Sequence, residues 1–209
     1  MTDIAELNVK TTSPGSAGTD RYRRGLRAAV RGMWTGVLTY YDFWDAMSTA
    51  IRNGLTTAWH AGMKDCGVNP DEMTEQERIS LLKRITYEHQ WINRFAQAIE
   101  QGSKANGGAL TPLYNRAEVW IGRWEGVRSE ARVMACADKK LKWTLGPTEH
   151  CSSCTKLAGQ VRRASFWNEK GILPRIHMAP YLECKGFRCQ CTLEPTDEPM
   201  SRGPLPKLP

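Results

Sequence analysis

Five of the seven cysteines in this 209-residue chain fall between residues 151 and 191. Cys151 and Cys154 form a C-x2-C pair, and Cys184, Cys189 and Cys191 follow about thirty residues later. A segment this short cannot build a large hydrophobic core, so we expect another interaction to hold it together.

Two close pairs of cysteines on separate loops suit a closed tetrahedral zinc site. The turn within Cys151-Ser152-Ser153-Cys154 lets both thiolates converge on one ion. The second pair is less regular, and Cys189 is preferred over Cys191 because it lies next to the loop. The sequence therefore predicts a structural Zn²⁺ with the ligands Cys151, Cys154, Cys184 and Cys189. Three residues remain open as replacements for Cys184 or Cys189: Cys191, His150 and His177.

Two other interpretations of the cysteines stay open, namely disulfides or thiols that are merely buried, and a redox C-x2-C motif. No βαβ pattern surrounds the motif, which disfavours the redox interpretation. The N-terminus has neither a basic segment nor an apolar one, so we expect a cytosolic protein in which disulfides are disfavoured. Cys66 and Cys136, on predicted helices, are interpreted as small core residues.

Helical periodicity dominates residues 20–138, where we expect an antiparallel unit of about four helices. The first begins near Asp20 and ends at Gly36, and Thr39 with Asp42 resembles a capping box for the second. Thr74 and Glu77 form a clearer capping box for a third helix that runs to Gly102. The apolar stripe of that third helix is Ile79, Leu82, Ile85, His89, Ile92, Ala96 and Ile99.

The pattern changes after Asp138, where short strand-like segments appear near residues 142–145, 160–164 and 191–195. The sequence predicts an α+β fold, with a mainly α-helical N-terminal unit and a small zinc-stabilised, β-rich C-terminal domain. The expected organisation is a disordered arm over 1–19, a helical domain over 20–138, a zinc-binding domain over 139–195 and a Pro-rich extended tail over 196–209.

The charge of the chain is formally +7, with 29 Lys and Arg against 22 Asp and Glu. Residues 139–209 hold twelve of the basic residues and six of the acidic ones. This permits contact with phosphates or an acidic partner, although a solvated basic surface explains it equally well. The sequence contains no apolar run of about 20 residues, so no membrane contact is expected. It also lacks a nucleophile elbow, a Walker loop and an H-E-x-x-H motif, so we expect no enzyme.

Three segments of the C-terminal part carry a family resemblance: Lys142–Cys154, Leu157-Ala158-Gly159 and Phe187–Leu193, which contains R-C-Q-C. Together they resemble the phage head morphogenesis domain of minor head proteins such as the F protein of phage Mu. Many members carry a His shortly before the closing element, where this chain has Cys184. The resemblance extends diffusely to residue 25.

The resemblance implies a minor capsid protein of the virion, present in few copies and made in the bacterial host cytoplasm. Its implied partners are the portal and other capsid components, with a role in head assembly, DNA packaging or DNA delivery. We also expect weak, non-specific contact with the phosphates of packaged DNA. Two alternatives are a zinc-ribbon DNA-binding protein and an HNH-type nuclease, for which His150, His177 and Asn168 have unsuitable spacing.

Overall fold

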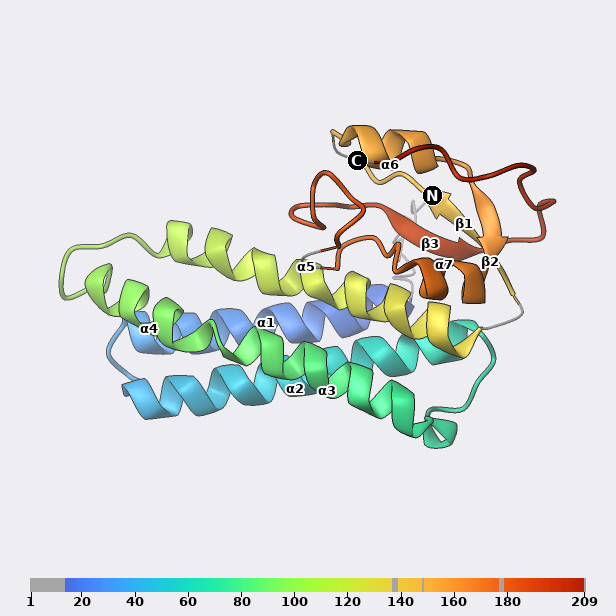
Figure 1. The fold of residues 1–209 in the computed structure, drawn as a ribbon. Coiled ribbons are helices and arrows are strands. Elements are labelled where there is room, and N and C mark those ends of the chain that lie inside the picture. The colour runs from blue at the N-terminus through green and yellow to red at the C-terminus, as the bar shows by residue number, and fades with distance from the viewer. Residues whose placement is uncertain (1–13, 137–138, 148, 177–178, 209) are drawn as a thin grey trace, which may run out of the picture.

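A computed structural model of the chain describes residues 14–136, 139–147, 149–176 and 179–208. It is mostly helical, with a small antiparallel sheet near the C-terminus, which confirms the predicted α+β class. Figure 1 shows the long helices lying side by side, with the sheet and its short helices against one end of α5. His177 lies outside the described residues.

The N-terminal part contains five α-helices and one short 3-10 helix. Its core is built from large side chains that are fully buried, among them Phe43, Leu55, Trp59, Phe95 and Trp124. The elements are α1 (Pro14–Trp34), α2 (Tyr40–Asp65), η1 (Pro70–Glu72), α3 (Glu75–His89), α4 (Ile92–Gln101) and α5 (Leu110–Ala135).

Both predicted capping boxes are present. The Thr39 side chain accepts a hydrogen bond from the Asp42 amide, and the Asp42 carboxylate accepts one from the Thr39 amide. Thr74 and Glu77 make the same reciprocal pair at the start of α3. Gly36 follows α1 with φ +79°, a left-handed conformation that favours glycine and lets the chain reverse into α2.

The first and third helices differ from the prediction. Helix α1 begins at Pro14, six residues before Asp20, so the predicted arm is helical over 14–19. The expected third helix is two helices, because its hydrogen bonding tightens where the Trp91 amide donates to the Glu88 carbonyl, only three residues back. The Gln90 side chain caps the same turn by donating to the Tyr87 carbonyl over 2.9 Å.

The buried face of α3 also differs from the predicted stripe. Ile79 and Leu82 are 36% and 60% exposed, whereas Leu81, Ile85 and Glu88 are buried. The positions 81, 85, 88, 92, 95 and 99 form one continuous helical face across the break. An acidic residue therefore occupies a core position, where Glu88 lies 3.4 Å from the Arg123 guanidinium.

The C-terminal part is a three-stranded antiparallel sheet with the order β2-β1-β3. In β1, the buried Leu141 and Trp143 alternate with half-buried neighbours, and Trp143 lies opposite Leu193 of β3. Trp143 also packs against Trp167, with ring centroids 5.8 Å apart. The elements are β1 (Lys140–Thr144), α6 (Ser152–Leu157), β2 (Val161–Arg163), α7 (Ala164–Lys170) and β3 (Thr192–Pro195).

This part has a larger hydrophobic core than its length predicts. The reason is that the core is shared with the helices: Val133 and Cys136 of the α5 end and Cys66 after α2 belong to the same buried cluster as Trp143 and Trp167. The C-terminal part therefore rests on the helical part and is not held by metal alone.

The tail covers the outer edge of β2, which is one of the two edge strands of the sheet. Residues 196–208 are all described and form no helix or strand. The Ser201 amide donates to the Val161 carbonyl over 3.0 Å, and the Val161 amide donates to Ser201 Oγ over 3.0 Å. Arg162 donates to the carbonyls of Ser201 and Gly203. These bonds satisfy polar groups of an edge strand that would otherwise be open to other chains.

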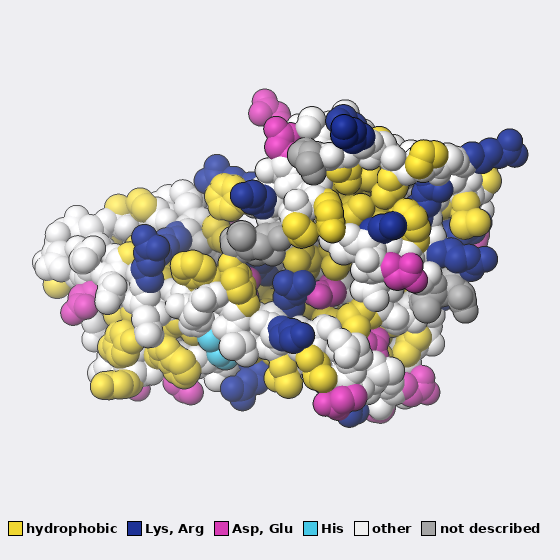
Figure 2. Space-filling model, in the orientation of Figure 1, with side chains coloured by type: hydrophobic (Ala, Val, Ile, Leu, Met, Phe, Trp, Pro, Cys, Tyr) yellow, Lys and Arg dark blue, Asp and Glu magenta, His cyan; other side chains and the backbone are white. Residues whose placement is uncertain are grey.

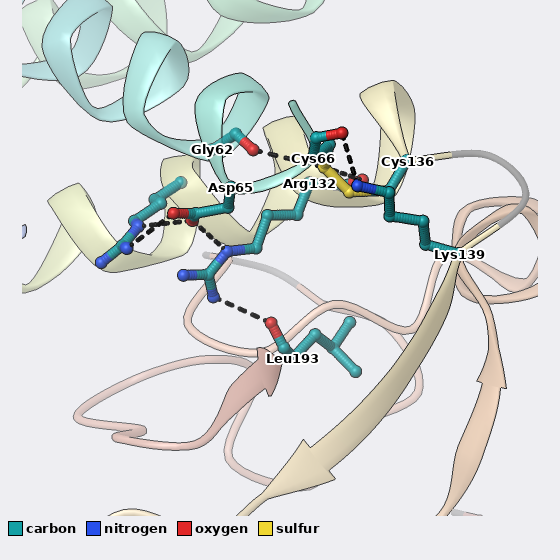
Figure 3. Close-up of a disulfide and its surroundings, with 8 residues drawn as sticks. Gly62, Asp65, Cys66, Arg132, Cys136, Lys139 and Leu193 are labelled. Atoms are coloured by element: carbon teal, nitrogen blue, oxygen red, sulfur yellow. Dashed lines mark hydrogen bonds and ion pairs between the residues drawn. A yellow bond between two sulfur atoms is a disulfide. The ribbon is translucent and has the colours of Figure 1, made fainter. Parts of the chain in front are cut away.

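A disulfide between Cys66 and Cys136 corrects the interpretation of these residues as isolated core thiols. It joins the residue that ends α2 to the residue that ends α5, with Cα atoms 5.3 Å apart (Figure 3). Beside it, Asp65 accepts hydrogen bonds from Arg128 and Arg132, and Arg132 Nη1 donates to the Leu193 carbonyl over 2.9 Å. The disulfide and this ionic cluster link α2, α5 and β3 at one point.

Candidate metal centre

The thiols of the C-terminal cluster come from one short helix and one loop. Cys151 is the N-cap of α6 and Cys154 lies in its first turn, 1% exposed. Cys184, Cys189 and Cys191 lie in the loop that precedes β3, where the described residues after Gly171 form no helix or strand. The loop and α6 thus meet at the cysteines.

Residues in the left-handed backbone conformation turn the chain within that loop. Lys185, Gly186 and Arg188 all have positive φ, at 47°, 74° and 51°. A Cβ atom on Gly186 would collide with the Ile176 carbonyl oxygen, so only glycine fits this close approach. Cys184 and Cys189 directly flank these residues in the chain.

The five sulfurs form two overlapping groups of ligand atoms within 4.8 Å of one another. One is Cys151, Cys154 and Cys184, and the other is Cys154, Cys189 and Cys191. Zn–S bonds of about 2.3 Å at tetrahedral angles place two sulfurs about 3.8 Å apart. Cys154 Sγ and Cys189 Sγ are 4.0 Å apart, so the donor set and its spacing fit a thiolate-bound metal ion.

All four predicted ligands lie in this cluster, and so does Cys191, which the sequence treats as a spare. Cys189 is grouped with Cys154 and Cys191 rather than with Cys151 and Cys184. Cys189 and Cys191 both precede β3, which begins at Thr192.

Backbone amides surround the outer sulfurs. Burial opposes ionisation of Cys151, but hydrogen bonds from the amides of Cys154 and Cys184 outweigh it and lower the pKa of Cys151. Hydrogen bonds from Cys154 and Cys191, together with the amides of Cys191 and Arg175, lower the pKa of Cys189. Amide donors stabilise the thiolate form, which is the form that binds metals.

Cys154 has a different environment. Hydrogen bonding to the sulfurs of Cys189 and Cys191, with burial added, raises the pKa of Cys154 far above its ordinary value. The metal-free cluster therefore keeps its central thiol protonated, and a bound cation would have to displace that proton.

His150 supports the cluster from the side. Its Nε2 lies 3.0 Å from the Gly146 carbonyl oxygen, so this nitrogen carries the proton. Its Nδ1 is 3.6 Å from Cys191 Sγ. A backbone carbonyl on one ring nitrogen and a ligand position on the other is the usual arrangement around protein metal sites.

Two supporting residues escaped the sequence analysis. Glu183 accepts hydrogen bonds from the Ser152 amide and hydroxyl over 2.9 and 2.7 Å, while its own amide donates to Ser153 Oγ over 3.0 Å. Arg175 donates to the carbonyls of Gln190 and Cys191. Ser152, Ser153 and Glu183 are sequence neighbours of the cysteines, and that adjacency was the available signal.

The described residues that form the two groups are all cysteines, without a carboxylate or imidazole among them. In the part of the chain that the structure describes, no helix is apolar and long enough to cross a bilayer. Comparison of the chain with protein-family models, with curated proteins and with solved structures finds no match.

Proposed function

We propose that the chain is a non-enzymatic structural protein of a phage head, in which zinc at the cysteine cluster fixes the C-terminal part as a rigid contact surface. The observation that carries this proposal is the convergence of five thiols from α6 and the loop before β3. The motifs that resemble minor head proteins are the same two segments, C-S-S-C and R-C-Q-C.

A structural role for the metal follows from its surroundings. Cys154 and Cys191 are 1% and 0% exposed, and Cys151, Cys184 and Cys189 are half-buried. A closed site with thiolate ligands stabilises the fold, whereas a catalytic zinc site keeps a position open for substrate.

The helical part offers a surface for a protein partner. Val37, Tyr40, Tyr41, Trp44 and Trp91, here called the aromatic edge, are 37–81% exposed. They lie just before α2, at its start and at the α3–α4 junction. The Tyr40 hydroxyl donates a hydrogen bond to Asn93 Oδ1 of α4 and so links these two regions. Aromatic side chains are enriched in protein interfaces, so we assign this edge to contact with the portal or another capsid component.

The arginines give less support to DNA contact. Arg27 pairs with Glu118 over 2.6 Å and Arg23 with Asp20 over 2.8 Å, so the basic face of α1 is partly neutralised. Arg162 binds carbonyls of the tail. Figure 2 shows Lys and Arg side chains spread over both parts of the visible face, with Asp and Glu among them. Any DNA contact would therefore be weak and confined to phosphates.

Quantitative proteomics of purified heads and procapsids tests the proposal. The protein should be present at far fewer copies than the major shell protein, and zinc should copurify with it. Absence from every assembly stage would refute the head role. Sequence-selective, nanomolar binding to duplex DNA would replace it with a regulatory one.

A further inference from the structure

The cluster contains more thiols than one metal ion needs. A tetrahedral ion takes four ligands, but among the described residues no four ligand atoms lie within 4.8 Å of one another. Two sets of three do, and Cys154 is the member they share. A single ion bound by four of the five cysteines would require at least one sulfur to move toward the others.

Each set of three is by itself a suitable site. Sulfur ligands of one tetrahedral ion are about 3.8 Å apart, and the sulfurs of each set lie within 4.8 Å of one another, so a contraction of at most about 1 Å would bring them to that spacing. Cys154 joins them because it lies on the first turn of α6, where its sulfur faces Cys151 on one side and the Cys189–Cys191 segment on the other.

The hydrogen bonds divide the thiols in the same way. The four outer sulfurs accept from backbone amides, whereas the contacts that dominate Cys154 come from other sulfurs. A thiolate bound to one ion has lone pairs left for N–H donors, and a thiolate bound to two ions uses them on metal. The amide donors are Cys154 and Cys184 for Cys151, Gly186 for Cys184, Cys191 and Arg175 for Cys189, and Gly146 for Cys191.

We propose that the cluster binds two metal ions bridged by the Cys154 thiolate. The first ion is bound by Cys151, Cys154 and Cys184, and the second by Cys154, Cys189 and Cys191. This deepens the proposed structural zinc site and rests on it.

His150 is the fourth ligand that we assign to the second ion. A nitrogen and a sulfur bound to one tetrahedral ion at about 2.1 and 2.3 Å are about 3.6 Å apart, which is the separation of His150 Nδ1 and Cys191 Sγ. His150 belongs to neither set in the metal-free chain, so its ring moves toward Cys154 and Cys189 when it completes the second ion. The first ion takes three thiolates from the described residues, namely those of Cys151, Cys154 and Cys184.

Two divalent ions neutralise more of the thiolate charge than one ion does. Five thiolates with two divalent ions leave one excess negative charge, while one ion with four thiolates and a neutral thiol leaves two. Arg175 is the cation beside the second ion, since its guanidinium binds the Gln190 and Cys191 carbonyls and interacts electrostatically with Cys189 and Cys191. The protons that these thiols still hold are released to solvent on binding.

Metal counting on the full chain tests the proposal. The protein is reconstituted with excess Zn²⁺, desalted, and measured by native mass spectrometry and by elemental analysis, with Co²⁺ as a second probe. We expect two ions per chain. Cys151→Ser and Cys191→Ser should each retain one ion, and Cys154→Ser should lose both or retain a single weakly held one. A Cys66→Ala/Cys136→Ala double variant, altered outside the cluster, should still bind two.

His150→Ala tests the fourth ligand of the second ion, and we expect the affinity of one ion alone to fall at least tenfold. Far-ultraviolet circular dichroism of every variant checks that the helical part stays folded. One ion in the wild type that survives Cys191→Ser overturns the pair and leaves the single structural zinc in place. No bound metal in the wild type overturns both proposals.

Discussion

At the scale of single residues, the sequence predicts which cysteines form the site but not how their sulfurs are grouped. The C-x2-C spacing and a second group of cysteines thirty residues later were sufficient to predict a thiolate site. The relation between Cys189 and Cys191 was not predictable, because it depends on the left-handed turns at Lys185, Gly186 and Arg188. Of these three, only glycine is a residue that commonly signals such a backbone.

The burial of Glu88 was not predicted at all, since the sequence gives no reason to expect an acidic residue in the helical core. Burial raises the pKa of Glu88 to about 7, against the opposing effects of Arg123 and Arg84. Arg123 Nε lies 3.4 Å away, and Arg84 is itself paired with Glu130 at 2.7 Å. Such a partly compensated carboxyl group costs stability when it ionises.

This pKa predicts how stability depends on pH. The folded chain holds a proton on Glu88 that the unfolded chain releases above its ordinary pKa of 4.5. The stabilisation is fully present below pH 4.5 and is lost as pH rises through about 7. Glu88→Gln should therefore gain stability relative to wild type between these values, by up to about 3 kcal/mol.

Urea unfolding of both proteins from pH 4.5 to 8 measures this difference. Glu118→Gln, which removes a pair with Arg27 at the surface, serves as the control and should show no such trend. Parallel stability curves for wild type and Glu88→Gln would show that folding does not raise the pKa of Glu88.

At the scale of helices and strands, local sequence signals predicted the structure correctly where no tertiary contact was involved. The capping boxes at Thr39 and Thr74 fixed the starts of α2 and α3, since each is complete within four residues. The face of α3 was misassigned because Ile79 and Leu82 are more apolar than Glu77 and Glu88, and only the partner helices decide which face is buried. Tertiary packing outweighed the local pattern.

The contact between α2 and α5 depends on Gly62. A Cβ atom there would lie 2.7 Å from Ala131 Cβ and would also collide with the Arg128 carbonyl oxygen. Gly62→Ala should force the helices apart and lower the free energy of unfolding by about 1–3 kcal/mol. Gly122→Ala, on a part of α5 with nothing within 4 Å, is the matched control and should stabilise by up to about 1 kcal/mol. Equal effects in denaturant unfolding would contradict this close approach.

The disulfide cross-links the C-terminal ends of the same two helices, and its two cysteines are 70 residues apart in the sequence. In the chain-entropy model, such a cross-link stabilises the fold by about 4 kcal/mol. Guanidinium unfolding of the zinc-loaded protein should show a loss of this size on reduction. The Cys66→Ala/Cys136→Ala variant should not respond to the reductant.

Thiol counting is an independent check on the disulfide. After zinc removal under denaturing, non-reducing conditions, an alkylating reagent should modify five cysteines and leave Cys66 and Cys136 unmodified. Modification of all seven would mean that these two residues are the core thiols that the sequence first indicated.

At the scale of the whole molecule, α5 carries the connection between the two parts. Its end contributes Val133 to the C-terminal core, and its middle carries Arg123, which contacts Glu88 on one side and the Arg175 carbonyl on the other. The sequence predicted a boundary at residue 138 from a change of pattern, but such a change does not reveal a shared core. The cysteine cluster and the aromatic edge thus belong to one packed structure.

The aromatic edge supplies the prediction for the assembled head. Tyr41 is 81% exposed and Trp44 38%, so Tyr41→Ala/Trp44→Ala should keep the fold and lower thermal stability only by the packing that Trp44 loses. Aromatic residues at the centre of an interface commonly contribute 2 kcal/mol or more to binding, so capture by purified portal should weaken by about 30-fold. Incorporation into heads should fall with it.

The matched control is Met200→Ala, which removes a side chain of similar exposure, 48%, from the tail on the other part of the molecule. Both variants are produced with zinc loaded, so that any loss of capture reflects the surface and not the cluster. If the double variant is captured and packaged like wild type, the edge is not the docking surface. If Met200→Ala reduces capture instead, the contact lies on the C-terminal part, where the zinc-ordered loop and the tail would form it.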